Sequence, residues 1–371
     1  MNFELTDERR MLSDSLRRYL GDTASHEATA KATEGETGFD PGLWSGLSEM
    51  GVIGALLPED AGGFGGAGFD ISVVFEEIGR AGAVVPLIES GVLAAGLLAE
   101  FGETEAAEAA IAGTVLTLAH AEPGSRYTLE HVETRAEQHD GGWRLSGRKS
   151  VVGFAAAAET LIVSARTGGE AADTDGISLF RVPAEAEGLT LRDYPMNGGG
   201  RAAEVALDGV PAEALIGPEG GAFDALERAH ARATCALSAE ALGLMETIRA
   251  LTVDYLRGRK QFGQPIGKFQ ALQHRMADVL IEIEQARSAV INLAGHLGAD
   301  RAERERHVSA TKNLIGRAGR LVAEEAIQMH GGIGMTQEYA LGHFAKRLIM
   351  VDHRFGDADH HLERFIRLSA A

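Results

Sequence analysis

The sequence predicts an α+β fold with three consecutive domains: a helical N-terminal domain, a middle β domain and a C-terminal four-helix bundle. Three observations predict this fold. Helical apolar spacing precedes residue 113, short β-type runs fill residues 114–220, and helical spacing returns over residues 221–371. The chain has 371 residues and is 45% hydrophobic, which is enough for more than one domain and a large buried core.

The N-terminal domain, residues 1–113, is rich in Ala, Glu and Leu. Its apolar side chains recur three or four residues apart, which is the spacing of one helix face. The examples are Leu5, Met11, Leu12, Leu16, Tyr19 and Leu20, and later Val73, Val74 and Ile78. We therefore expect a helical domain.

The middle domain, residues 114–220, has the texture of a small sheet. Its β-type runs are TVLTLAH, WRLSG, TLIVSAR, ISLFRV and AEVAL. Turn dipeptides punctuate these runs at Asp140-Gly141, Asp175-Gly176 and Asp208-Gly209. This alternation of apolar runs and turn residues predicts a β domain.

The C-terminal domain, residues 221–371, predicts four packed helices. The connection GRKQFGQPIGK is short, so the first two helices should be antiparallel. The third should end at His330-Gly331-Gly332. Their inward-facing residues begin with Leu237, Ala241, Leu244 and Ile248, continue with Met276, Val279, Ile283 and Val290, then with Val308, Ile315 and Val322, and end with Leu341, Phe344, Leu348, Val351 and Phe355.

Charge and cysteine content exclude several classes of protein. The formal charge of −19 disfavours nucleic acid as a partner, because the phosphate backbone would be repelled. The single cysteine, Cys235, forms no intrachain disulfide and fits a reducing compartment. The first ten residues lack the apolar core of a leader, and no run of about 18 apolar residues occurs. We expect a cytoplasmic protein without membrane insertion.

Residues Gly63 to Gly68 match the dinucleotide pattern G-x-G-x-x-G, with Glu89 at a suitable distance downstream. However, Pro58-Glu59-Asp60 separates the glycines from the apolar stretch before them, and the surrounding segments lack repeated strand–helix–strand units. We expect this match to be a false positive.

Three other motifs are more specific when taken together. Arg259 opens RKQFG between the first two bundle helices, Gln328-Met329-His330-Gly331-Gly332 closes the third, and Glu122-Pro123-Gly124 ends a β run. An arginine fork suits a pyrophosphate, and paired glycines let backbone approach an anion. Singly, each motif also fits a plain alternative, since glycines stop helices and a loop arginine is usually solvated.

In this order and spacing, the motifs resemble the acyl-CoA dehydrogenase family over the whole chain. The resemblance implies FAD bound between the β domain and the bundle, with a second protomer completing each site. It implies that Arg259 and Phe262 contact the FAD of one protomer, and that Gln328, Gly331 and Gly332 reach the dinucleotide of its neighbour. It also implies an acyl-CoA substrate and electron-transfer flavoprotein as the electron acceptor.

Longer segments resemble a two-subunit branch of the family. AHAEPGSRYTL, GRAAEVALDGV, LTVDYLRGRKQFG and KRLIMVDHRFGDADHHL are similar to the small subunits of pimeloyl-CoA dehydrogenases. This resemblance implies a partner that is a homologous large subunit, although a homo-oligomer is also compatible with the family. It makes pimeloyl-CoA, a dicarboxylyl-CoA, a candidate substrate.

The family's catalytic carboxylate is missing from both positions that supply it. The base removes the α-proton of the thioester in a dry pocket, where burial raises its pKa toward neutrality. The two family positions fall on Ala233 and Phe355 in this sequence. The family's tryptophan and threonine beside the flavin ring fall on Val151 and Gly153.

Three explanations remain open for the missing base. A partner subunit supplies it, a nearby carboxylate replaces it, or the chain binds without dehydrogenating. Asp357 and Asp352 are the nearest replacements, but each also fits a helix-end cap. Glu240 lies near the apolar stripe of the first bundle helix and fits an ion pair at its edge.

We predict no metal site. The run Asp357-Ala358-Asp359-His360-His361 contains ligand-type residues. Adjacent histidines on a helix point about 100° apart, so they rarely bind one ion.

Overall fold

The computed structural model describes residues 5–370, so the first four residues of the segment considered as a leader lie outside it. By its internal contacts the chain forms two compact units. The bundle unit holds the described residues up to 30, residues 68–83 and those from 234 onward, and the sheet unit holds residues 31–67 and 84–233. The boundaries 1–113, 114–220 and 221–371 stay a prediction.

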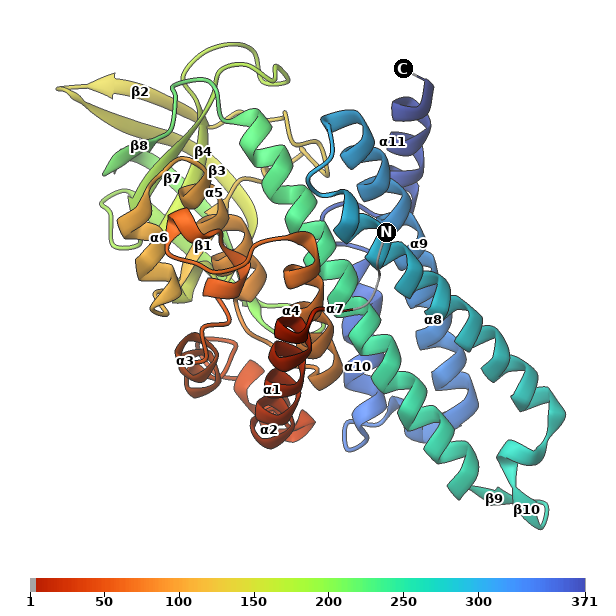
Figure 1. Ribbon diagram of the computed structural model, residues 1–371. Helices are drawn as coiled ribbons and strands as arrows, with labels where there is room; N and C mark the ends of the chain where they lie inside the picture. Colours follow the sequence, from red (N-terminus) through yellow and green to blue (C-terminus); the bar gives the residue numbers. More distant parts are fainter. Residues whose placement is uncertain (1–4, 371) are drawn as a thin grey trace. The chain divides into compact units, whose positions relative to one another are not determined.

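The bundle unit consists of helices, several of which pack on α9 (Figure 1). α9 contacts α8, α10 and α11, and α4 packs on α1 and α8. The helices are α1 (Asp7–Thr23), α2 (His26–Thr33), α4 (Gly68–Ala81), α7 (Phe223–Gly258), α8 (Gln270–His296), α9 (Arg301–His330), α10 (Ala340–Val351) and α11 (Ala358–Ala370). Along the chain, α2 and α7 each pass from one unit into the other.

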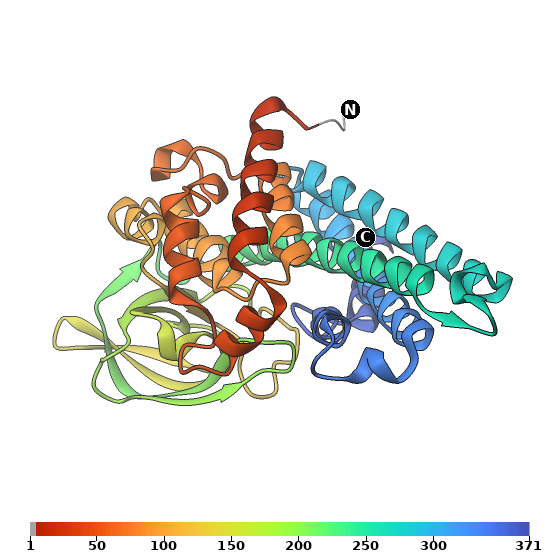
Figure 2. The ribbon, with the colours of Figure 1, turned by 90° about the horizontal axis from the view of Figure 1, so that it is seen from below.

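The predicted apolar stripes form the core of this unit. Side chains at the predicted positions of α7, α8 and α9 are buried, including Leu244, Ile283 and Ile315. α7 and α8 run side by side in both views and are joined by the hairpin of β9 (Lys260–Gln261) and β10 (Gln264–Pro265), followed by the 3-10 helix η5 (Ile266–Lys268) (Figures 1 and 2). The predicted antiparallel pair is therefore confirmed.

One prediction for the bundle is wrong. The apolar spacing predicts Phe355 on the fourth helix, but α10 ends at Val351 and Phe355 lies in the turn before α11. Its φ of +56° is in the left-handed region, which a helix cannot contain. The turn residues around Phe355 override the apolar spacing that suggested a continuous helix.

The sheet unit contains one eight-stranded sheet in the order β6-β7-β3-β2-β4-β5-β8, with β1 paired in parallel to β4. Its core includes Leu145, Leu161, Val163, Phe180 and Val205. The strands are β1 (Leu116–Ala119), β2 (Arg135–His139), β3 (Gly142–Gly153), β4 (Thr160–Arg166), β5 (Ile177–Pro183), β6 (Leu189–Pro195), β7 (Arg201–Ala212) and β8 (Ala214–Ile216).

Short helices make up the rest of the sheet unit. They are α3 (Pro41–Glu49), the 3-10 helices η1 (Gly54–Leu56), η2 (Glu59–Ala61) and η4 (Ala155–Ala157), the π-helix η3 (Leu87–Ala94), α5 (Ala95–Glu100) and α6 (Thr104–Ile111). The Gly63–Gly68 run follows η1 and η2 rather than a strand, so the dinucleotide pattern is a false positive, as expected. No helix within residues 5–370 is both long and apolar enough to span a bilayer.

The turn dipeptides have two different outcomes. Asp140 and Gly141 join β2 to β3 with φ of 50° and 81°, so the predicted turn is the tight turn of a β-hairpin. The prediction that Asp208-Gly209 ends a strand is wrong. Both residues lie inside β7, where the register against β3 shifts between Leu145 and Gly147, so the dipeptide forms a β-bulge.

Candidate functional site

The first group of predicted site residues lies at one end of the bundle unit. Arg259 follows α7, and its backbone N–H donates to the carbonyl of Tyr255 at 2.8 Å. Phe262 occupies the tip of the β9–β10 hairpin with φ of +53° and is 91% exposed. The side chains of Arg259 and Phe262 are therefore exposed and point away from the core.

The second group of predicted site residues lies at the same end of the unit, where α9 ends. His330, the last residue of α9, stacks on Tyr255 in the last turns of α7, with ring centroids 4.4 Å apart. Gly331 has φ of 68° and ψ of −146°, a conformation that only glycine adopts readily. Gln328, Gly331 and Gly332 are all exposed. The ring stack thus places the Arg259 turn and the paired glycines at one end of the bundle.

These residues fit the pyrophosphate of FAD. A pyrophosphate needs cations and backbone that can approach closely, and this end presents the exposed cations Arg259 and Lys260 together with two exposed glycines. A Cβ on Gly331 or Gly332 would meet nothing within 4 Å in this chain. The open space is therefore available to a ligand or a second protomer.

The turn from Arg354 to Asp357 holds Phe355, at the position that the resemblance assigns to the base. Phe355 is half-buried there, and the guanidinium of Arg354 lies 5.3 Å from its ring centroid. The carboxylate of Asp357 accepts from the N–H of His360 at 2.8 Å, and that of Asp352 accepts from the N–H of Ala358 at 3.0 Å. Both predicted replacement bases therefore cap the start of α11.

A buried lysine clamps this turn from α9. Lys312 is fully buried, and its ammonium donates to the carbonyls of Gly356 at 2.5 Å and Asp352 at 3.2 Å. Burial lowers the pKa of Lys312 to about 8, although Asp352 and Asp357 act in the opposite direction. His361 donates to the carbonyl of Phe355 at 2.8 Å, and burial lowers its pKa to about 3.

Two other positions considered for the base also have structural roles. Ala233 is completely buried within α7. Glu240 is buried and accepts from the guanidinium of Arg347 at 2.8 Å, which is the ion pair that its position suggested. Within residues 5–370, His360 and His361 belong to no group of three ligand-type side chains close enough to share an ion.

In the sheet unit, the Glu122-Pro123-Gly124 segment is anchored by a buried ion pair. The carboxylate of Glu122 accepts from the ammonium of Lys149 at 2.7 Å and from the N–H groups of Glu133 and Thr134. Burial raises the pKa of Glu122, but Lys149 and these hydrogen bonds outweigh it and lower that pKa. Burial lowers the pKa of Lys149 to about 8. Glu122 is therefore an ionised anchor for this segment.

One buried carboxylate in the sheet unit is not indicated as a base by the sequence. Glu89 lies on η3 and is 6% exposed, and a Cβ on Gly153 would be 2.8 Å from its Oε1. The sequence presents Glu89 only as the acidic partner of the rejected dinucleotide pattern. Nothing in the local sequence indicates its approach to the end of β3, which depends on the packing of η3 against the sheet.

The family comparison covers the chain in three consecutive matches. Residues 6–115, 117–210 and 223–363 match the models described as the N-terminal, middle and C-terminal domains of acyl-CoA dehydrogenases. The acyl-CoA dehydrogenase IpdE2 of Mycolicibacterium smegmatis is 30% identical over 92% of this chain and 93% of its own length. These matches confirm the predicted family and fold class.

Two similar solved structures each have a name that joins two components. A chain of a variant of the Tcur3481-Tcur3483 steroid ACAD is 33% identical, with a TM-score of 0.87 and 98% of each chain covered. A chain of the ChsE4-ChsE5 complex from Mycobacterium tuberculosis is 27% identical, with a TM-score of 0.89 over 100% of this chain and 99% of that one. The chain thus belongs to the acyl-CoA dehydrogenase family of FAD-binding oxidoreductases, which act on the CH–CH group of acyl-CoA thioesters.

Proposed function

We propose that this chain is the small subunit of a heteromeric FAD-dependent acyl-CoA dehydrogenase and that its partner supplies the catalytic base. The observation that carries the proposal is the turn from Arg354 to Asp357. Phe355 stands where the family has a glutamate, and the nearest carboxylates, Asp352 and Asp357, are engaged as caps of α11. Each of these carboxylates is held in place by the backbone N–H from which it accepts.

Desaturation of an acyl-CoA requires two events at neighbouring carbons. A carboxylate takes the α-proton, and bound FAD supplies the acceptor for the β-hydride. The side chain of Phe355 has no proton acceptor, so this chain contributes an apolar wall at that position, not a base. Arg259, Phe262, Gln328, Gly331 and Gly332 would hold FAD, the first two that of one protomer and the other three that of its neighbour.

The names of the similar complexes support a two-subunit assembly, since Tcur3481-Tcur3483 and ChsE4-ChsE5 each join two components. The substrate is an acyl-CoA, and two candidates are distinguishable. Pimeloyl-CoA follows from the sequence resemblance to that enzyme's small subunit, and a steroid acyl-CoA follows from the word "steroid" in the name of the first complex. Electrons would leave through electron-transfer flavoprotein, and a cytoplasmic location stays a prediction.

A second candidate function is a catalytically silent subunit that completes a flavin site owned by its partner. The lack of a carboxylate at Ala233 and Phe355 supports this second function as much as it supports the first. The two functions differ in what the complex loses when this chain's flavin-binding residues are changed. A silent subunit would leave turnover per bound flavin unchanged.

The test compares the chain alone with the chain coexpressed with its genomic neighbour. We expect flavin absorbance and bleaching by acyl-CoA in the complex, and turnover at least about 10² to 10⁴ lower in the chain alone, the usual effect of losing a positioned base. A panel with pimeloyl-CoA and a steroid acyl-CoA would identify the substrate.

Carboxylate variants of the complex test the alternative of a replacement base. Asp352→Asn, Asp357→Asn and Glu89→Gln should each retain most of the turnover. Rapid turnover by the chain alone, abolished by one of these changes, would contradict the proposal and identify that carboxylate as the base. Absence of flavin from the complex would contradict both candidate functions.

A further inference from the structure

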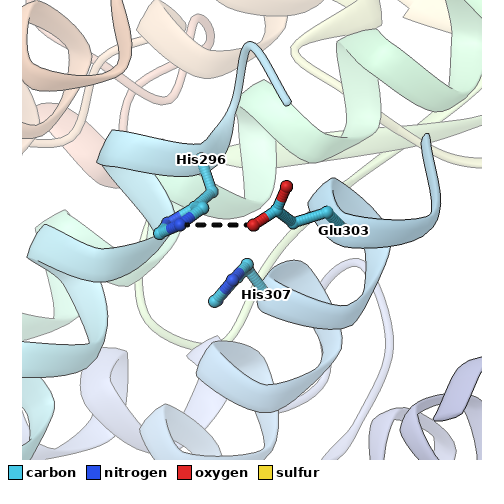
Figure 3. A group of neighbouring side chains, drawn as sticks. All are labelled: His296, Glu303 and His307. Atoms are coloured by element: carbon cyan, nitrogen blue, oxygen red, sulfur yellow. Dashed lines mark ion pairs between the residues drawn. The ribbon is translucent and has the colours of Figure 1, made fainter. Parts of the chain in front are cut away.

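A cluster of three ligand-type side chains lies where α8 turns into α9 (Figure 3). His296 is the last residue of α8, and Glu303 and His307 lie one turn apart on the same face of α9. One potential ligand atom from each residue lies within 4.8 Å of the other two. All three residues belong to the bundle unit and are partly exposed, so an ion could reach them.

The backbone of this cluster is fixed by the helices. The carboxylate of Asp300 caps α9 by accepting from the N–H of Glu303 at 3.0 Å. One turn beyond His307, the hydroxyl of Thr311 donates to the carbonyl of Ala289 on α8 at 3.2 Å. The three side chains can therefore converge on an ion through changes in side-chain torsions alone. Sites whose residues lie on helices also hold their geometry well.

The tautomer of the neutral His296 ring follows from its hydrogen-bond partner. Its Nδ1 lies 2.7 Å from the carbonyl of Asn292, and a carbonyl only accepts, so Nδ1 carries the proton. In the neutral ring, Nε2 then presents its lone pair, and it lies 3.6 Å from the carboxylate of Glu303. Two acceptors that face each other at this distance favour a positive charge between them.

His307 completes the set after a rotation of its ring. It stacks on His296 with centroids 3.8 Å apart and an interplanar angle of 21°, so the lone pairs of the two rings do not converge in this arrangement. Its Nδ1 lies 3.0 Å from the side-chain amide of Asn292. Rotation about χ2 is soft for histidine, and a 180° turn of the Asn292 amide would offer its oxygen to Nδ1–H and leave Nε2 as a ligand.

We propose that His296, Glu303 and His307 bind a divalent transition-metal ion of the zinc type, which cross-links α8 to α9. Two imidazoles and one carboxylate match the preference of zinc for nitrogen and oxygen ligands. With bonds of about 2.0 to 2.1 Å, tetrahedral ligand atoms lie about 3.3 Å apart. The 3.6 Å between His296 and Glu303 is close to this spacing, and His307 makes the larger adjustment.

The surrounding charges limit the affinity but do not prevent binding. Glu303 neutralises one charge of the ion, and Arg306 is near enough to act electrostatically on His307. A fourth position remains for water or a side chain from another subunit. Glu303 and His307 have the i, i+4 spacing of one helix face, but His296 precedes the turn into α9, so helical spacing alone does not indicate the site.

Zinc binding to the untagged protein, isolated with any copurifying partner, tests the proposal by equilibrium dialysis with zinc chloride. We expect one zinc per chain and a rise in melting temperature. His296→Gln, Glu303→Gln and His307→Gln should each lower the zinc affinity by about tenfold or more, since even the loss of an outer hydrogen-bonding partner costs about 10- to 100-fold. His274 is an exposed histidine on α8, the helix of His296, so His274→Gln is the matched control and should leave the zinc affinity unchanged.

Asn292→Asp provides a test by gain of affinity. A carboxylate that accepts from a ligating histidine raises the basicity of that ligand, so this variant should bind zinc more tightly than the natural chain. Equal zinc binding by the natural chain and the three ligand variants would overturn the proposal. Zinc binding that His274→Gln weakens as much as His307→Gln would overturn it as well, because it would indicate scattered surface histidines.

Discussion

Two regions of the bundle unit differ in how they relate to the family motif. The end formed by Arg259, Gly331 and Gly332 has the residues that the resemblance assigns to FAD, and it exposes them. The turn from Arg354 to Asp357 has Phe355 where the resemblance predicts a carboxylate, and hydrogen bonds from Lys312 and His361 hold its backbone. Lys312 and His330 mark the two regions on α9, and their 18-residue separation corresponds to about 27 Å. The predicted cofactor contacts and the predicted position of the base therefore lie at separate places along α9.

The two regions also differ in what stabilises them. At the turn, a buried lysine and a buried histidine bond to the backbone carbonyls, so the backbone is fixed without any ligand. At the glycine end, the side chains face outward, and a ligand or a neighbouring chain would order them. The turn should therefore respond to mutation through stability, and the glycine end through cofactor affinity.

The largest expected effect on stability is at Lys312. In the folded chain its pKa is about 8 against an ordinary value of 10.5, so between these values the unfolded chain binds more protons. The contribution of Lys312 to the free energy of unfolding then rises with pH over that window. The destabilisation caused by Lys312→Met should grow by about 2 kcal/mol from pH 7 to pH 9.5.

Chemical denaturation of the natural chain and the variant at both pH values measures this difference. Lys346→Met, an exposed lysine on α10, is the control and should show no such pH dependence. A destabilisation by Lys312→Met that is the same at both pH values would mean that the lysine does not change its protonation there. The flavin content of the complex should stay the same for both variants.

The next effect concerns Arg259 and cofactor retention. A hydrogen bond to a charged group contributes about 1.5 to 3 kcal/mol, so Arg259→Ala should weaken FAD binding by roughly 10- to 150-fold. Flavin fluorescence titration of the complex measures the affinity, and the melting temperature of the apoprotein should be unchanged. Arg257→Ala, an exposed arginine two residues earlier, is the control. Unaltered FAD affinity in Arg259→Ala would remove this residue from the cofactor site.

Sequence periodicity predicts the helices well because each long helix buries one continuous face. The same reasoning finds β4 as TLIVSAR, a strand whose residues are nearly all buried. It misses β2 and β6, whose sequences RAEQH and LTLRDYP carry charges on largely exposed strands. Their position in the sheet comes from backbone pairing with β3 and β7, which composition does not encode.

The site is only partly predictable from sequence, for the same reason. Arg259 and the paired glycines are contiguous motifs, so their residue types indicate an anion. The clamp of Lys312 on Gly356 and the approach of Glu89 to Gly153 join residues far apart in the chain. Such contacts follow from tertiary packing, and no local sequence pattern predicts them.

The smallest expected effect separates a cap from a catalytic base at Asp357. Its carboxylate accepts from the N–H of His360 at the first turn of α11, so Asp357→Ala should lower the free energy of unfolding by about 1 kcal/mol. Asp357→Asn keeps a capping oxygen and should cost only a few tenths of a kcal/mol. As a cap, Asp357 should leave turnover of the complex nearly unchanged in the Asn variant, whereas a base would lose about 10² to 10⁴. Denaturation and steady-state turnover, measured beside Asp359→Asn as an exposed control on the same helix, decide between these roles. A stable Asp357→Asn complex that no longer turns over would make Asp357 catalytic and remove the contrast between the two regions.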